Sequence, residues 1–429
     1  MYYFLYSILI ILTIYSDSPL QHQLNYFGRT FIPVIAYPLY IIMSINKSLP
    51  KGDIFLDKYG KLLWYTIGIS IFALLVCWIG GFGMNHLGEF LPAKMIKMIF
   101  IYFSYWIYLK LLINLSAHLS FKQVCIPFFY GLVLITIIAY IEYYIGEFIF
   151  NPIHFGDASF MEWDYNRVRL LCSESSFTVP LIEIFLGVSL YYSHFISKSF
   201  FLKIITYLCG FLLLYTTGSK TLLIAIFIAV FYSFYVTSKG HFNASRIISI
   251  IIILFIAYMY FIYIMPTLQN KLSYDMNEST STVTRTYTVI MGYFVGIVSV
   301  VGTGFQSYLV FYPQLLKDFL GLIDLYMPNA NLSEIISYIN STNGQNISAK
   351  SFFAQTSMFW GICGTIYFIK SYLKVYQSLQ FEKNIEKIIL GSVTFVILFQ
   401  LLFTADMDYI ILALMAVLIN IKWHKKKNK

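Results

Sequence analysis

The stretch LLLYTTGSKTLLIAIF, residues 212–227, places two apolar runs on either side of a short polar turn that contains Lys220. Each run belongs to a longer apolar segment, near 199–216 and 221–237. A helix needs about 20 apolar residues to cross the hydrocarbon core of a bilayer. The stretch therefore predicts two membrane-spanning helices joined by a turn, with Lys220 at a membrane surface, where its charge is tolerated.

The composition of the whole chain indicates the same environment. Of the 429 residues, 59% are hydrophobic, 19% are aromatic and only 11% are charged, whereas about 25% are charged in soluble globular proteins. The apolar runs are continuous and do not alternate with polar residues, which favours helices over a membrane β-barrel. The predicted fold is an all-α, polytopic transmembrane helix bundle, with the lipid bilayer as its first partner.

Apolar runs predict about twelve spans distributed over the whole chain. They lie near 2–16, 29–45, 62–80, 97–116, 124–146, 175–195, 199–216, 221–237, 246–265, 352–370, 387–404 and 407–422. We expect a single integral membrane domain over residues 1–429, with two longer loops at 147–174 and 266–351. The second loop contains YTVIMGYFVGIVSVVGTGF (287–305), which is apolar enough to touch or re-enter the membrane, so we expect it to be partly helical.

The distribution of charge predicts the orientation. Most of the 29 lysines and arginines fall in loops on one side of the membrane if both termini are cytoplasmic, as the preference of cytoplasmic loops for basic residues requires. The net charge of +9 is then a signal of topology, and we expect no nucleic-acid partner. Both long loops lie on the outer face in this arrangement.

Metal and nucleotide chemistry have no support in the sequence. The five cysteines and seven histidines occur without the paired spacing of a metal site, and we expect no metal and no cofactor. The GTG at 302–304 lacks the spacing of a dinucleotide-binding loop. It is better interpreted as a turn or a close-packing site.

Four cations on the predicted outer side form a candidate anion-binding set: Arg167, Arg169, Lys220 and Arg285. Guanidinium groups bind phosphate oxygens bidentately, and lysine adds a point charge, so such a set suits a phosphate or pyrophosphate. Each residue also has a structural alternative. Lys220 could reach the membrane interface, Arg285 could anchor a helix end, and Arg167 and Arg169 could pair with acids of their own loop. Those acids are Asp157, Glu162 and Asp164.

An ordered set of short motifs resembles O-antigen polymerases and the related O-antigen ligases. The motifs are RLLCSESSF (169–177), TTGSKTLL (216–223), STVTRTYTV (281–289), VVGTGFQSY (300–308) and SAKSFFAQTSMFWGICG (348–364). Lys220 stands where this family more commonly has arginine.

The resemblance implies a GT-C-like, multi-pass glycosyltransferase of the bacterial cytoplasmic (inner) membrane. It implies polymerisation of undecaprenyl-pyrophosphate-linked oligosaccharide repeat units into O-antigen, the lipopolysaccharide polymer, or capsular polysaccharide. The active face is periplasmic or extracellular, and a chain-length regulator and a flippase are possible partners.

Within that resemblance, Arg169, Lys220 and Arg285 are expected to stabilise the pyrophosphate leaving group, with Arg167 in reserve. Glu174 is the leading candidate for the base that accepts the proton of the attacking sugar hydroxyl. His154 is expected to contact the glycan or the pyrophosphate and competes with Glu174 as a base, as do Asp157 and Glu162 of the same loop. Asp406 and Asp408, in TADMDY, rank below them because two acids beside a span are typical of an interfacial turn.

Two other functions remain open. An O-antigen ligase uses the same lipid-linked donor, and these motifs do not separate it from a polymerase. A flippase or another twelve-span carrier is typically built from two similar halves with charges along a central path. Here the intramembrane acids are few, Glu142 and Glu183, and the long second loop breaks any repeat, which favours an enzyme of the outer face.

Overall fold

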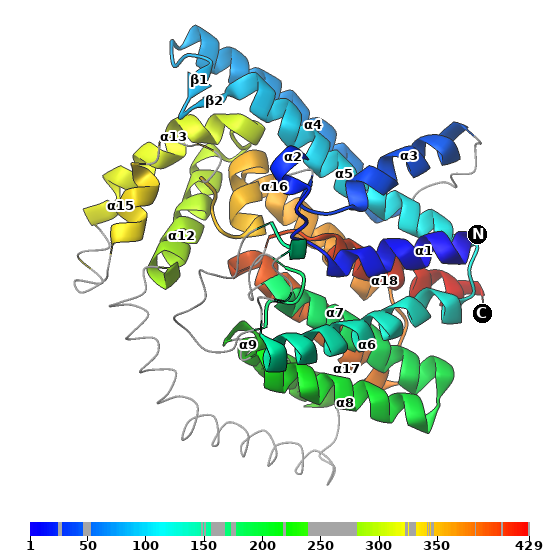
Figure 1. Ribbon diagram of the computed structural model, residues 1–429. Coiled ribbons are helices and arrows are strands. Elements are labelled where there is room, and N and C mark those ends of the chain that lie inside the picture. The colour runs from blue at the N-terminus through cyan, green and yellow to red at the C-terminus, as the bar shows by residue number, and fades with distance from the viewer. Residues whose placement is uncertain are drawn as a thin grey trace.

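The computed structural model is a bundle of helices, with almost no strand structure in the part of the chain that it describes (Figure 1). The described residues are 1–24, 28–45, 53–146, 149, 152–155, 168–172, 177–217, 220–238, 281–321, 325, 332–340, 342, 344, 347–381, 383–404 and 406–427. The predicted all-α membrane fold is confirmed at this level.

Seven helices of the described residues are long and apolar enough to cross a membrane. They are α4 (Ile54–Ile79), α5 (Leu91–Ala117), α6 (Phe121–Ile145), α7 (Thr178–Tyr191, continued by the π-helical turn η6, Tyr192–Ser197), α8 (Phe200–Thr217), α16 (Phe352–Gln377) and α17 (Asn384–Phe403). A bent pair of helices, described below, would add an eighth. The count of about twelve spans and the GT-C-like arrangement stay predictions.

Four of the remaining predicted spans are helices that fall outside this set. They are α1 (Tyr2–Ile11) with the 3-10 turn η1 (Leu12–Ile14), α3 (Ile32–Ile45), α9 (Lys220–Ser238) and α18 (Tyr409–Lys427). The short helix α2 (Gln21–Leu24) lies between α1 and α3. The predicted span at 246–265 lies outside the described residues.

Helix α18 forms the centre of the bundle. Residues 410–421 are almost completely buried, and α18 packs against α5, α6, α7 and α16. A helix that is apolar on every side is stable in such a surrounded position. Two acids fix its basic end, because Lys422 lies 3.8 Å from Asp53, which caps the start of α4, and Lys425 pairs with Glu386 of α17.

Both termini lie at the same end of the bundle (Figure 1). The turn between α5 and α6 contacts both of them, since His118 stacks on Tyr2 with ring centroids 4.5 Å apart and Phe121 lies 5.2 Å from His424. This geometry agrees with an arrangement in which both termini lie on one side of the membrane. Their cytoplasmic location stays a prediction.

The described parts of the second long loop contain three helices. They are α12 (Ser281–Ser299), α13 (Gly304–Asp318) and α15 (Ser333–Ile339). The axes of α12 and α13 are bent by 116° across a short break, which makes the pair a broken span or a re-entrant loop. At the break, Gly302 has φ +94°, and a Cβ atom there would lie 2.2 Å from the Phe359 carbonyl oxygen. The GTG is thus a close-packing turn, as the sequence predicted.

A two-residue hairpin connects α4 to α5. Its strands β1 (Asn85–His86) and β2 (Glu89–Phe90) pair antiparallel. The α5 helix then runs back towards the turn that contacts both termini, so its first turns lie at the opposite end of the bundle (Figure 1).

Candidate functional site

The segment after α1 is held in place at the end of the bundle opposite the termini. Its sequence, YSDSPLQH (15–22), is polar and contains a proline, which cannot continue a helix without losing a hydrogen bond. The Ser16 N–H donates to the Leu171 carbonyl over 2.9 Å, and the Phe155 N–H donates to the Asp17 carbonyl over 3.1 Å. Backbone bonds therefore join this segment to the described parts of the first long loop.

A buried ionic cluster strengthens that junction. The Asp17 carboxylate lies 2.9 Å from His154 Nδ1 and 4.0 Å from Arg169 Nη1, and all three side chains are at least 95% buried. Two of the predicted site residues, His154 and Arg169, are thus brought together. Their shared partner Asp17 comes from the segment after the first predicted span, and the acids of their own loop, Asp157, Glu162 and Asp164, lie outside the described residues.

Glu142 fixes the backbone on which Arg169 lies. It is buried in the last turn of α6, and its two carboxylate oxygens accept the N–H groups of Arg169 (2.6 Å) and Leu170 (2.8 Å). Leu170 has φ +54°, a left-handed conformation that is rare for a residue with a side chain. Glu142 therefore holds a strained turn in place, which is a structural role for one of the two intramembrane acids.

Next to this junction, two neighbouring cavities form a cleft. The first is lined by Ser16, Arg29, Thr30, Pro33, Ile101, Ser104, Tyr105, Phe177, Asp406, Met407, Asp408 and Tyr409. The second is lined by Lys94, Lys97, Met98, Ile101, Tyr102, Tyr105, Tyr308, Ile347, Ser348, Phe352, Gln355, Asp406 and Met407. Four lining residues are common to both, so the cavities adjoin. The second is the larger, about 170 Å³ against about 30 Å³.

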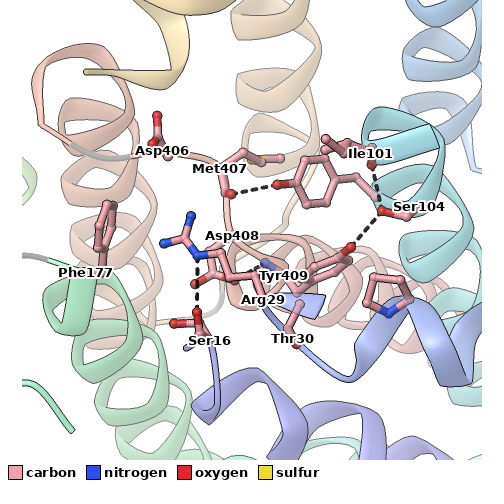
Figure 2. Close-up of a pocket in the computed structure, with 12 residues that line it drawn as sticks. Ser16, Arg29, Thr30, Ile101, Ser104, Phe177, Asp406, Met407, Asp408 and Tyr409 are labelled. Atoms are coloured by element: carbon pink, nitrogen blue, oxygen red, sulfur yellow. Dashed lines mark hydrogen bonds between the residues drawn. The ribbon is translucent and has the colours of Figure 1, made fainter. Parts of the chain in front are cut away.

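The smaller cavity places an arginine beside a carboxylate (Figure 2). The Arg29 Nε–H donates to the Ser16 carbonyl over 3.2 Å, and the guanidinium carbon lies 5.0 Å from the centre of the Phe177 ring. Burial raises the pKa of the Asp408 carboxyl group above its ordinary value, and the charge of Arg29 acts in the opposite direction. Asp408 is therefore a carboxyl group whose proton affinity is increased at the wall of a cavity.

Two lysines line the larger cavity. Lys94 is buried in the first turn of α5, where its Nζ donates to the Gly344 carbonyl over 2.8 Å and lies 5.7 Å from the centre of the Tyr308 ring. Lys97 follows it by one helical turn and is half-buried. With Arg29, the described part of the cleft has three cations, and Asp406 lines both cavities.

The other predicted site residues have different outcomes. Arg285 is half-buried in α12, which packs against α13, α15 and α16, and it is not among the described residues that line the cleft. Lys220 is the first residue of α9, but its side chain lies outside the described part of the structure, as do Arg167 and Glu174. Their predicted roles stay predictions.

Within the described ranges, no group of three or more His, Cys, Asp or Glu side chains is placed to hold a metal ion. Four of the five cysteines, all except Cys363, are buried, and all five are free thiols.

The fold and the cleft define a membrane protein with transmembrane helices and a charged cleft at the end of the bundle opposite its termini. Comparison of the chain with protein-family models, with curated proteins and with solved structures finds no match.

Proposed function

We propose that this chain is a membrane glycosyltransferase that polymerises undecaprenyl-pyrophosphate-linked repeat units into O-antigen or capsular polysaccharide at the outer face of the bacterial cytoplasmic membrane. The supporting observation is the cleft, which combines three cations, two carboxyl groups and several aromatic rings at one end of a helical membrane bundle. The family resemblance of the motifs supplies the substrate class.

The cations suit the leaving group of this reaction. Transfer of the glycan breaks the bond between its anomeric carbon and a pyrophosphate oxygen, so negative charge grows on the pyrophosphate. Fixed positive groups in a partly dry site stabilise such charge strongly because they need no reorganisation. Lys94 and Lys97 line the larger cavity and Arg29 the adjoining one, so we assign the pyrophosphate to the space between them.

The carboxyl groups suit the acceptor. The attacking sugar hydroxyl forms the new bond to the anomeric carbon and must lose its proton to a nearby base. Asp408 faces the cleft with a raised pKa, and a base is most effective when its pKa approaches the working pH. We therefore assign Asp408 as the proton acceptor, with Asp406 beside it. Glu174 remains the alternative base.

The buried cluster has a positioning role in this proposal. Asp17, His154 and Arg169 lie behind Ser16, whose carbonyl holds the Arg29 guanidinium. Loss of the cluster would move Arg29 relative to Asp408 without removing any group from the cleft.

Deletion of the gene in a strain with a laddered surface polysaccharide tests the proposal. A polymerase deletion leaves surface material capped with a single repeat unit, whereas loss of all surface glycan would indicate the ligase or the flippase instead. Complementation with Arg29→Ala or Asp408→Asn should give only the single-repeat product at normal membrane abundance. Lys317→Ala, which removes an exposed cation from the last turn of α13, is the matched control and should restore the full ladder.

A further inference from the structure

A third cavity lies away from the cleft, on the side of the bundle formed by α7, α9 and α17. Its volume is about 260 Å³. It is lined by Glu183, Gly187, Leu190, Leu222, Ala225, Ile226, Ala229, Ile388, Ile389, Ser392, Val393 and Val396. Nearly all of this surface is apolar, and the cavity opens to the outside of the bundle. We refer to it as the lateral groove.

Close helix contacts shape the lateral groove. A Cβ atom on Gly187 of α7 would lie 2.1 Å from a methyl group of Val393 on α17, and one on Gly391 of α17 would lie 2.3 Å from the ring of Tyr232 on α9. These two glycines allow α17 to pack tightly against both neighbours. The groove lies along α17 between these contacts, so packing of the described helices maintains it.

One polar group of the lateral groove has an unused hydrogen-bonding atom. Glu183 Oε1 accepts a hydrogen bond from Gln400 Nε2 over 3.0 Å. Glu183 Oε2 is buried and has no hydrogen-bond partner in the described part of the structure. A buried carboxyl group without a full set of partners is costly in hydrocarbon, so Oε2 offers a hydrogen-bonding position to a ligand in an otherwise apolar groove.

The position of Glu183 along α7 indicates how a ligand would be oriented in the groove. It lies five residues after the start of the helix at Thr178, or roughly 7.5 Å at the usual rise per residue. The groove continues from Glu183 past Gly187 to Leu190, away from the end that holds the cleft. The polar end of a ligand would therefore lie just inside the bundle, with its apolar part directed along the groove.

We infer that the lateral groove binds the hydrocarbon chain of a lipid whose polar end has a hydroxyl group that hydrogen-bonds to Glu183. A hydroxyl group both donates and accepts, so it satisfies Oε2 whether the carboxyl group is ionised or protonated. The apolar lining of the groove stabilises the bound lipid by contact with its hydrocarbon chain. This site is separate from the proposed transferase cleft and does not depend on it.

Photo-crosslinking of the purified full-length protein tests the inference. The probes are a long-chain alcohol with a diazirine in its chain and the matching hydrocarbon without the hydroxyl. We expect the alcohol to label peptides of α7, α9 and α17 about fivefold more than the hydrocarbon, the ratio that a net hydrogen bond of about 1 kcal/mol gives. Glu183→Gln keeps both a donor and an acceptor and should retain this preference, whereas Glu183→Leu should abolish it.

A blocking variant separates groove binding from general contact with lipid. Ala229→Phe fills the groove from α9 and should reduce labelling of its lining by both probes, while size-exclusion behaviour reports that the variant is folded. Equal labelling by the two probes in the unmodified protein, or labelling that survives both Glu183→Leu and Ala229→Phe, would overturn the inference. Polysaccharide polymerisation is not measured in this experiment, so its result is independent of the proposed enzymatic function.

Discussion

Asp17→Asn is expected to be the most damaging conservative substitution at the junction behind the cleft. The carboxylate lies 4.0 Å from Arg169 Nη1 and 2.9 Å from His154 Nδ1, in a buried environment. Two unit charges 4 Å apart interact by about 4 kcal/mol at an effective dielectric constant near 20. Removing one member of a buried pair typically costs about 3 to 5 kcal/mol because the other charge stays buried. We expect Asp17→Asn to lower the free energy of unfolding by about 3 kcal/mol.

A double-mutant cycle measures whether that loss comes from the charge of Arg169. Unfolding is followed in mixed detergent micelles as the denaturing detergent is increased, for Asp17→Asn, Arg169→Met and the double variant. If the pair is the cause, the double variant is less destabilised than the sum of the single variants by about 1 to 3 kcal/mol. The control is Asp318→Asn, which changes an exposed acid on α13 and should cost less than about 0.5 kcal/mol. Additive single effects, or an Asp17→Asn loss as small as that of the control, would refute the proposed pairing.

Three further predictions concern other parts of the molecule. Gly302→Ala should cost about 2 kcal/mol or more in the same unfolding assay, because φ is +94° and the new Cβ would meet the Phe359 carbonyl oxygen at 2.2 Å. Burial raises the pKa of Asp408 above 3.8, so the folded state binds the proton of this carboxyl group more tightly than the unfolded state. The free energy of unfolding should therefore fall as the pH rises from the unfolded-state pKa to the folded-state pKa of Asp408. Asp408→Asn should reduce this dependence on pH, and an unchanged dependence would contradict a raised pKa at Asp408. If the cleft faces outwards, a membrane-impermeant maleimide should label Ser348→Cys in intact cells, whereas Gln380→Cys, at the end that holds the termini, should react only after permeabilisation.

The helices could be predicted from the sequence, but their places in the bundle could not. Every predicted span whose residues are described is helical, because a helix satisfies the backbone hydrogen bonds of a continuous apolar run within the run itself. The central position of α18 was not predictable. A run such as 409–421 is equally apolar whether it faces lipid or other helices, since hydrophobicity provides no preference between the two. Its burial depends on complementary packing against α5, α6, α7 and α16, which a single sequence does not reveal.

The candidate site could likewise be predicted only in part. Arg169 and His154 were selected from the sequence because they belong to a charged outer loop, and they do lie together. Their shared partner Asp17 is more than 130 residues from His154 in the chain, so local sequence context could not indicate it, and pairing of Arg169 with the acids of its own loop stays a prediction. The sequence context of Asp408 is typical of an interfacial turn, yet Asp408 lines the cleft with Arg29.

The alternating direction of the helices explains why these distant residues meet. It indicates which loops share one end of the bundle, and a local motif does not. Helices that cross a membrane alternate in direction, so every second loop lies at the same end of the bundle. The segments that contain Asp17, Arg29, His154, Arg169 and Asp408 all lie at the end opposite the termini. Few charges are available at that end in a chain with 11% charged residues, and each one that is buried needs a partner from the same small set. Sorting the charges of such a chain by predicted side, before searching for motifs, would therefore place Asp17 and Arg29 among the candidates. Only the packed structure shows that Asp17 lies next to Arg169 and that Arg29 shares a cavity with Asp408.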